Sequence, residues 1–69
     1  MIDPLFTYVL LNDEGRQKAT DIATHFTALL EELEVMCPKG RELSIVRTKL
    51  EEACFYSKKS LIHFKGNRA

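Results

Sequence analysis

Apolar residues recur along the first half of the chain at the spacing of one face of a helix. They occupy positions i, i+4, i+7, i+8 and i+11, the pattern of an amphipathic helix and not the alternation of a strand. These positions are Ile22, Phe26, Leu29, Leu30 and Leu33. Asn12 or Asp13 can cap the start of this helix. The pattern therefore predicts a helix over about residues 13–36.

A Cys-Pro-Lys-Gly turn follows this helix. Pro38 disfavours helical geometry in the residue before it, and Gly40 readily adopts the conformations that end a helix. A second apolar or small-residue stripe then begins, at spacings of three and four. Its members are Leu43, Val46, Leu50, Ala53, Cys54, Ser57 and Leu61. We predict a second helix over about residues 41–63, antiparallel to the first.

The predicted fold class is all-α, a single domain built as an antiparallel two-helix hairpin. An N-terminal arm (1–12) precedes the helices, the turn spans 37–40, and a short basic tail (64–69) follows. A chain of 69 residues builds only a small core, which is marginally stable without further support. Phe55 and Tyr56 add a second apolar face to the second helix. We therefore expect the protein to assemble as a homo-oligomer.

Composition argues against several classes of function. Ten acidic and ten basic residues give zero net charge, so no broad field attracts DNA, RNA or a membrane surface. Cys37 and Cys54 are too few for a disulfide framework, and His25 and His63 lack zinc-site spacing. No nucleophile is paired with a base, and no glycine-rich phosphate loop precedes a helix. We expect neither an enzyme nor a resident metal or cofactor.

Binding chemistry is available in the arm and near the helix ends. The rings of Phe6 and Tyr8 could stack on a nucleobase, or could only pack the arm onto the hairpin. Arg16 and Lys18 lie in the first turns of a helix, where free N–H groups favour phosphate, but could equally be solvated surface charges. Antiparallel packing would bring Lys59 towards the same end. A basic patch could form there.

Three stretches of the chain carry a family resemblance. They are the Phe6-Thr7-Tyr8 triplet, the Cys37-Pro38 turn followed by Arg41, Glu42 and Ser44, and the TKLEEA run at 48–53. With these stretches the chain resembles the hairpin family of bacteriophage anti-CBASS sponges, and is similar to the hairpin region of sponges that counter Thoeris defence. The pair Phe55-Tyr56 replaces a Met-Trp pair of many relatives, which keeps large apolar volume at both positions.

The resemblance implies a homohexamer of helical hairpins that binds cyclic dinucleotides between protomers, and in some members cyclic trinucleotides at separate sites. Such a protein sequesters its ligand without cleavage, in the cytoplasm of the infected bacterial host, and so blocks anti-phage signalling. Tyr8 would stack on a base and Lys18 would contact a phosphate, a role it could exchange with Arg16. Phe6, Thr7 and Arg16 would complete the pocket wall. Lys59 is a candidate for trinucleotide binding. Arg41 and Thr48 would either contact ligand or serve in turn capping and protomer packing.

Two other classes of function stay open. A small helical regulator or adaptor that binds a host protein would use the same amphipathic faces. A nucleic-acid-binding hairpin would need a concentrated basic face, which interleaved acidic residues disfavour.

Overall fold

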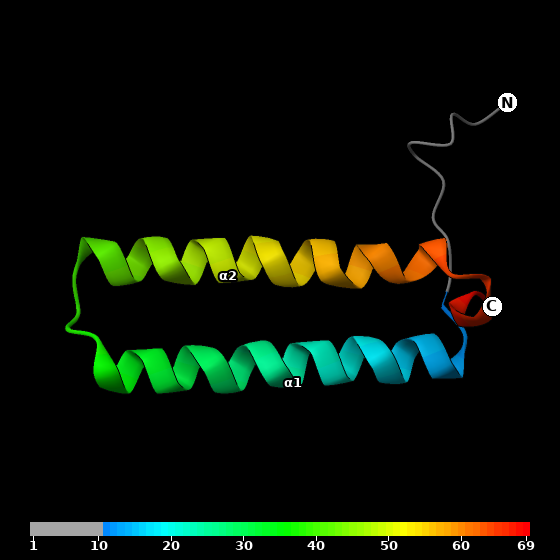
Figure 1. Ribbon diagram of the computed structural model, residues 1–69, viewed down its shortest axis with the longest axis horizontal. Coiled ribbons are helices and arrows are strands. Elements are labelled where there is room, and N and C mark those ends of the chain that lie inside the picture. The colour runs from blue at the N-terminus through cyan, green and yellow to red at the C-terminus, as the bar shows by residue number, and fades with distance from the viewer. Residues whose placement is uncertain (1–10) are drawn as a thin grey trace, which may run out of the picture.

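Two long antiparallel helices make up most of the structure, a computed structural model that describes residues 11–69 (Figure 1). Helix α1 spans Asp13–Met36 and helix α2 spans Arg41–Ser60. The chain reverses between them through residues 37–40. The predicted all-helical hairpin is therefore confirmed for the described residues. The expectations for Phe6, Thr7 and Tyr8 lie outside them.

Local capping explains where α1 begins and ends. The side-chain oxygen of Asn12 accepts a hydrogen bond from the Gly15 N–H at 2.8 Å, which satisfies one of the free donors of the first turn. Acidic side chains in that turn complement the positive end of the helix dipole. At the other end, Cys37 is extended, as expected before Pro38, and its N–H donates to the Leu33 carbonyl.

Helix α2 begins after an extended Gly40 and has no side-chain cap. Its last turn contains Lys58 and Lys59, which complement the negative end of the dipole. The α-helix ends at Ser60, and the chain continues as a 3-10 turn, η2, over Leu61–His63. The last three residues expected in the second helix therefore form a tighter turn.

The two helices pack along a narrow seam of half-buried side chains. Within residues 11–69 no apolar side chain is fully buried, so a single hairpin has only half-buried side chains in its core. Two residues of the predicted stripes, Leu29 and Ala53, are exposed instead. Each is next in sequence to a half-buried residue, and one neighbouring helix covers only a narrow stripe. The seam comprises Ile22, Phe26, Leu30 and Leu33 of α1 with Leu43, Val46, Leu50 and Cys54 of α2.

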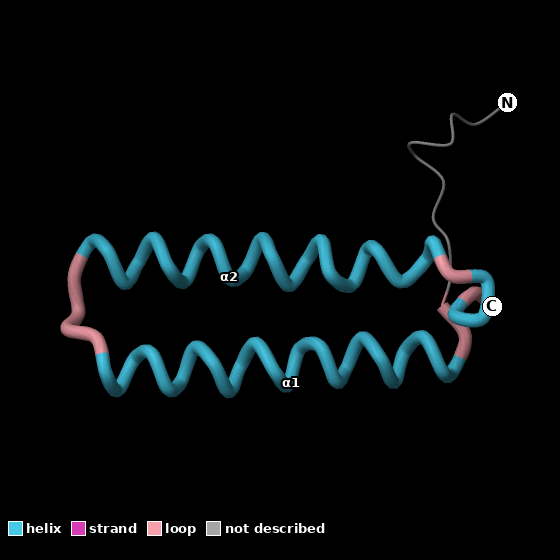
Figure 2. The backbone as a smooth tube through the Cα atoms, in the orientation of Figure 1, coloured by secondary structure: helices cyan, strands magenta, loops and turns pink. Residues whose placement is uncertain are grey.

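The segment after η2 folds back onto the start of α1. A second 3-10 turn, η3, spans Lys65–Asn67, and Figure 2 shows it at the end of the hairpin opposite the 37–40 turn. Leu11 and Arg68 form an isolated antiparallel bridge, and the Asn12 N–H donates to the Asn67 carbonyl oxygen at 2.8 Å. The residues expected as a basic tail thus pack against the first turn of α1.

Within residues 11–69, neither helix combines the length and the apolar character that a membrane span requires.

Candidate functional site

The described candidate residues divide between the two ends of the hairpin. Arg16 and Lys18 lie in the first turns of α1, and Lys59 lies in the last turn of α2, at the same end of the molecule (Figure 1). Arg41 begins α2 at the opposite end, about 27 Å from Lys59 along the helix axis. No pocket within one protomer can use Arg41 and Lys18 together.

Lys18 is held by contacts from both ends of the described chain. Its Nζ donates to the Asn67 Oδ1 at 2.8 Å and lies 5.1 Å from the centroid of the Phe64 ring. The Glu14 carboxylate is 3.7 Å away, which is an ion pair but too long for a hydrogen bond. The lysine side chain remains 40% exposed. Because an ammonium group has three donors, it can still offer N–H groups to a ligand.

Arg16 lies where the chain enters α1. Its guanidinium pairs with Asp13, and its Nη1 donates to the Leu11 carbonyl oxygen at 3.1 Å. Both partners are on the entering chain or the first turn, so Arg16 is fixed beside the junction with the arm. The guanidinium has five donors, and its side chain is largely exposed, so donors remain for an anion.

Lys59 belongs to an exposed aromatic face of α2. Its Nζ lies 5.9 Å from the centroid of Phe55, and the rings of Phe55 and Tyr56 meet edge to face with centroids 5.2 Å apart. These rings are 58% and 64% exposed. Lys58 instead borders hollows next to α1. The two lysines therefore serve different surfaces, although they are neighbours in sequence.

Arg41 and Thr48 border one shallow hollow on the surface of α2, of about 420 Å³. The Thr48 hydroxyl donates to the Ser44 carbonyl within the helix, at 3.2 Å. Arg41 is exposed at the first position of α2. These two residues form a group apart from Lys18 and Arg16.

A comparison with protein families decides the family of this hairpin. The family model described as Acb2/Tad1, hairpin domain, matches residues 1–61 of the chain. The chain belongs to the Acb2/Tad1 hairpin family. This match confirms the resemblance seen in the sequence. No curated protein and no solved structure matches the chain.

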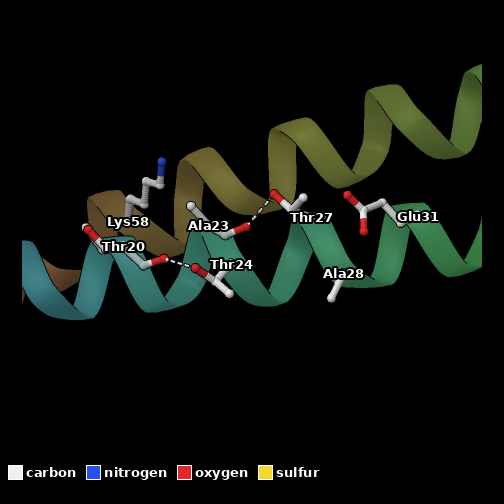
Figure 3. Close-up of a pocket in the computed structure, with 8 residues that line it drawn as sticks. Thr20, Ala23, Thr24, Thr27, Ala28, Glu31 and Lys58 are labelled. Carbon is white, nitrogen blue, oxygen red and sulfur yellow. Dashed lines mark hydrogen bonds between the residues drawn. The ribbon is translucent and has the colours of Figure 1, made fainter.

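This member of the Acb2/Tad1 hairpin family has a trough along α1 that the sequence analysis missed. It has a volume of about 500 Å³ and is floored by alanine and threonine side chains, with Lys58 and Glu31 at its borders (Figure 3). The hydroxyls of Thr24 and Thr27 donate to carbonyls four residues earlier in the helix. The sequence does contain a pattern that indicates this trough: pairs of small residues recur every four positions, at 19–20, 23–24 and 27–28.

The contact between η3 and α1 was also missed. Phe64 and Asn67 lie beyond the residues that the Acb2/Tad1 hairpin model matches. Asn67 is 2% exposed and is the one fully buried polar side chain among residues 11–69. Its partner Lys18 is 49 residues away in sequence. No local sequence pattern predicts a contact between residues so far apart.

In the described part of the chain, no three His, Cys, Asp or Glu side chains gather closely enough to hold a metal ion.

Proposed function

We propose that the protein is a non-catalytic sponge that sequesters cyclic dinucleotide second messengers, with cyclic trinucleotides as ligands of separate sites. Membership of the Acb2/Tad1 hairpin family over residues 1–61 carries this proposal. The protein would act by stoichiometric capture in the cytoplasm of an infected bacterium. A bacterial immune effector would then lack its activating ligand, which stays chemically intact.

The chemistry at one end of the hairpin supports this function. A cyclic dinucleotide presents two phosphates and two bases, so its pocket needs hydrogen-bond donors of positive charge beside flat apolar surfaces. Lys18 and Arg16 are both at the α1 start, and each has donors left over from its own protein contacts. We assign Lys18 to a phosphate and the arm residues Phe6, Thr7 and Tyr8, with Arg16, to the pocket wall. Tyr8 would stack on a base.

Assembly into a homohexamer is the second part of the proposal. Several large apolar side chains are exposed on one protomer, including Phe55, Tyr56 and Ile45 of α2. A single hairpin whose seam lacks a fully buried apolar residue gains little stability alone. Covering this face with further copies would supply the missing core. A pocket built from two copies of one chain also suits a ligand with two similar halves.

The remaining candidates belong to secondary sites in this proposal. Lys59, beside the exposed Phe55 ring, is assigned to trinucleotide binding. Arg41 and Thr48 share a hollow on α2 and are assigned to ligand contact or to packing between protomers.

Isothermal titration with a panel of cyclic di- and trinucleotides tests the proposal. Linear dinucleotides of the same bases serve as controls, and the ligand is recovered after binding and checked by chromatography. Tight binding of a cyclic member with recovery of intact ligand supports a sponge. Absence of binding to every member of the panel would favour a helical regulator of a host protein instead. Conversion of the ligand would reveal an enzyme.

A further inference from the structure

Both polar groups of the buried Asn67 side-chain amide form hydrogen bonds within the protein. Its Oδ1 accepts from Lys18 Nζ at 2.8 Å, and its Nδ2 donates to the Leu61 carbonyl at 3.0 Å. The carbonyl of Leu61 therefore fixes the amide so that its oxygen, the acceptor, faces the ammonium group. The backbone of the same residue is held by Asn12, whose N–H donates to the Asn67 carbonyl. The acceptor that meets Lys18 is thus a rigid one.

We propose that Asn67 is a positioning residue that presents the Lys18 ammonium to a ligand phosphate. This inference rests on the proposed function and adds to it a residue outside the family match, which ends at Leu61. A free lysine loses side-chain entropy when it binds a phosphate, because its four-carbon stem must be ordered. Asn67 orders that stem before the ligand arrives.

The character of the contact suits presentation of a charge. An amide is neutral, so the hydrogen bond fixes Lys18 without cancelling its positive charge, whereas a buried carboxylate would cancel it. The Glu14 carboxylate, 3.7 Å from the ammonium, is largely exposed, so water screens most of its effect on that charge. The Phe64 ring stabilises the same ammonium through its π-face, again without adding a negative charge. Only one N–H of Lys18 goes to Asn67, and part of the side chain is exposed. The lysine is therefore held in place and still able to bind.

A double-mutant cycle separates positioning from a general structural role. The Kd of the tightest-binding cyclic dinucleotide is measured for Asn67→Ala, Lys18→Met and the double variant. We expect Asn67→Ala to weaken binding about threefold to tenfold, the loss expected when one flexible side chain is no longer ordered in advance. Lys18→Met should weaken it further, and the double variant should bind like Lys18→Met alone. Lys39→Met, which removes a charge at the opposite turn, should leave Kd unchanged.

Equal losses from Asn67→Ala with and without Lys18 would overturn the inference, as would an unchanged Kd. Unfolding temperature is recorded in parallel, because the loss of the Leu61 contact should lower it in both backgrounds. Where Asn67→Ala does not fold, Phe64→Leu replaces it, since Phe64 is exposed at 60%. It should weaken binding about twofold to fivefold, and only when Lys18 is present.

Failure of this inference can be distinguished from failure of the proposed function. If the wild-type protein binds no member of the panel, the proposed function fails and the inference fails with it. If the wild type binds but the losses of affinity from Asn67→Ala and Lys18→Met simply add, the proposed sponge function is retained and Asn67 has only a structural role.

Discussion

Gly15 and the carbonyl oxygen of Asn67 approach so closely that a β-carbon on Gly15 would lie 2.5 Å from that oxygen. The same β-carbon would meet the Leu11 Cβ at 3.0 Å. Both neighbours are fixed, because Asn67 accepts from the Asn12 N–H and Leu11 pairs with Arg68. Glycine is thus required here by the close packing of η3 on α1.

Replacing Gly15 by alanine should therefore destabilise the protein. At an open helix position this change gains about 1 kcal/mol of helix stability. Here we expect the overlap with Asn67 to outweigh that gain and to lower the free energy of unfolding by about 1–3 kcal/mol. Thermal unfolding at a fixed protein concentration should show a lower midpoint, by about 4–8 °C for each kcal/mol.

Gly40→Ala is the matched control for this substitution. A β-carbon on Gly40 would meet only the flexible end of Glu42, at 3.9 Å. We expect a change below about 1 kcal/mol, as for an ordinary loss of a glycine cap. A Gly15→Ala variant that is more stable than the wild type, as at an open helix position, would show that η3 does not pack on α1 in solution.

Asn12 joins the helix cap to the C-terminal segment, and its two roles can be separated. Its Oδ1 caps Gly15, while its Nδ2 donates to the carbonyls of Gly66 at 2.6 Å and Arg68 at 3.1 Å. Asn12→Ala should lower the free energy of unfolding by about 2–3 kcal/mol, more than the roughly 1 kcal/mol typical of a lost cap. Urea unfolding measures the difference.

Asn12→Asp distinguishes the cap from the contacts with Gly66 and Arg68. Aspartate caps a helix as well as asparagine does, but it cannot donate, and its charge would face two carbonyl oxygens. We therefore expect Asn12→Asp to remain clearly less stable than the wild type. Full stability of this variant would mean that the cap is the only role of Asn12.

The helices could be predicted from sequence because their signals are local and periodic. The spacing of residues such as Phe26 and Leu30 indicates a helical face, and Pro38 marks the end of α1. The position of η3 could not be predicted in this way. It depends on polar contacts between residues far apart, such as Lys18 with Asn67, which leave no periodic trace. For the same reason, the sequence left Lys18 open as a phosphate ligand or a solvated charge.

The exposed aromatic pair of α2 provides a test of assembly. Phe55 and Tyr56 are more than half exposed on one protomer, so we expect them to be covered in an oligomer. Replacing both by serine should lower the mass seen in sedimentation velocity at micromolar concentration. Lys39→Met, an exposed change in the 37–40 turn, should leave the assembly intact. A wild-type protein that sediments as a well-folded monomer would contradict this expectation.

Tyr8, which lies outside the described residues, provides the sharpest test of the arm. If its ring stacks on a base, Tyr8→Ala should weaken binding of a cyclic dinucleotide at least roughly tenfold, since such stacking contributes about 1–3 kcal/mol. The oligomer should keep its mass in sedimentation. Tyr8→Phe retains the π-face and should bind nearly as well as the wild type, which separates stacking from a hydrogen bond of the hydroxyl. An unchanged affinity of Tyr8→Ala would remove the tyrosine from the pocket, and the affinity would then have to come from other residues.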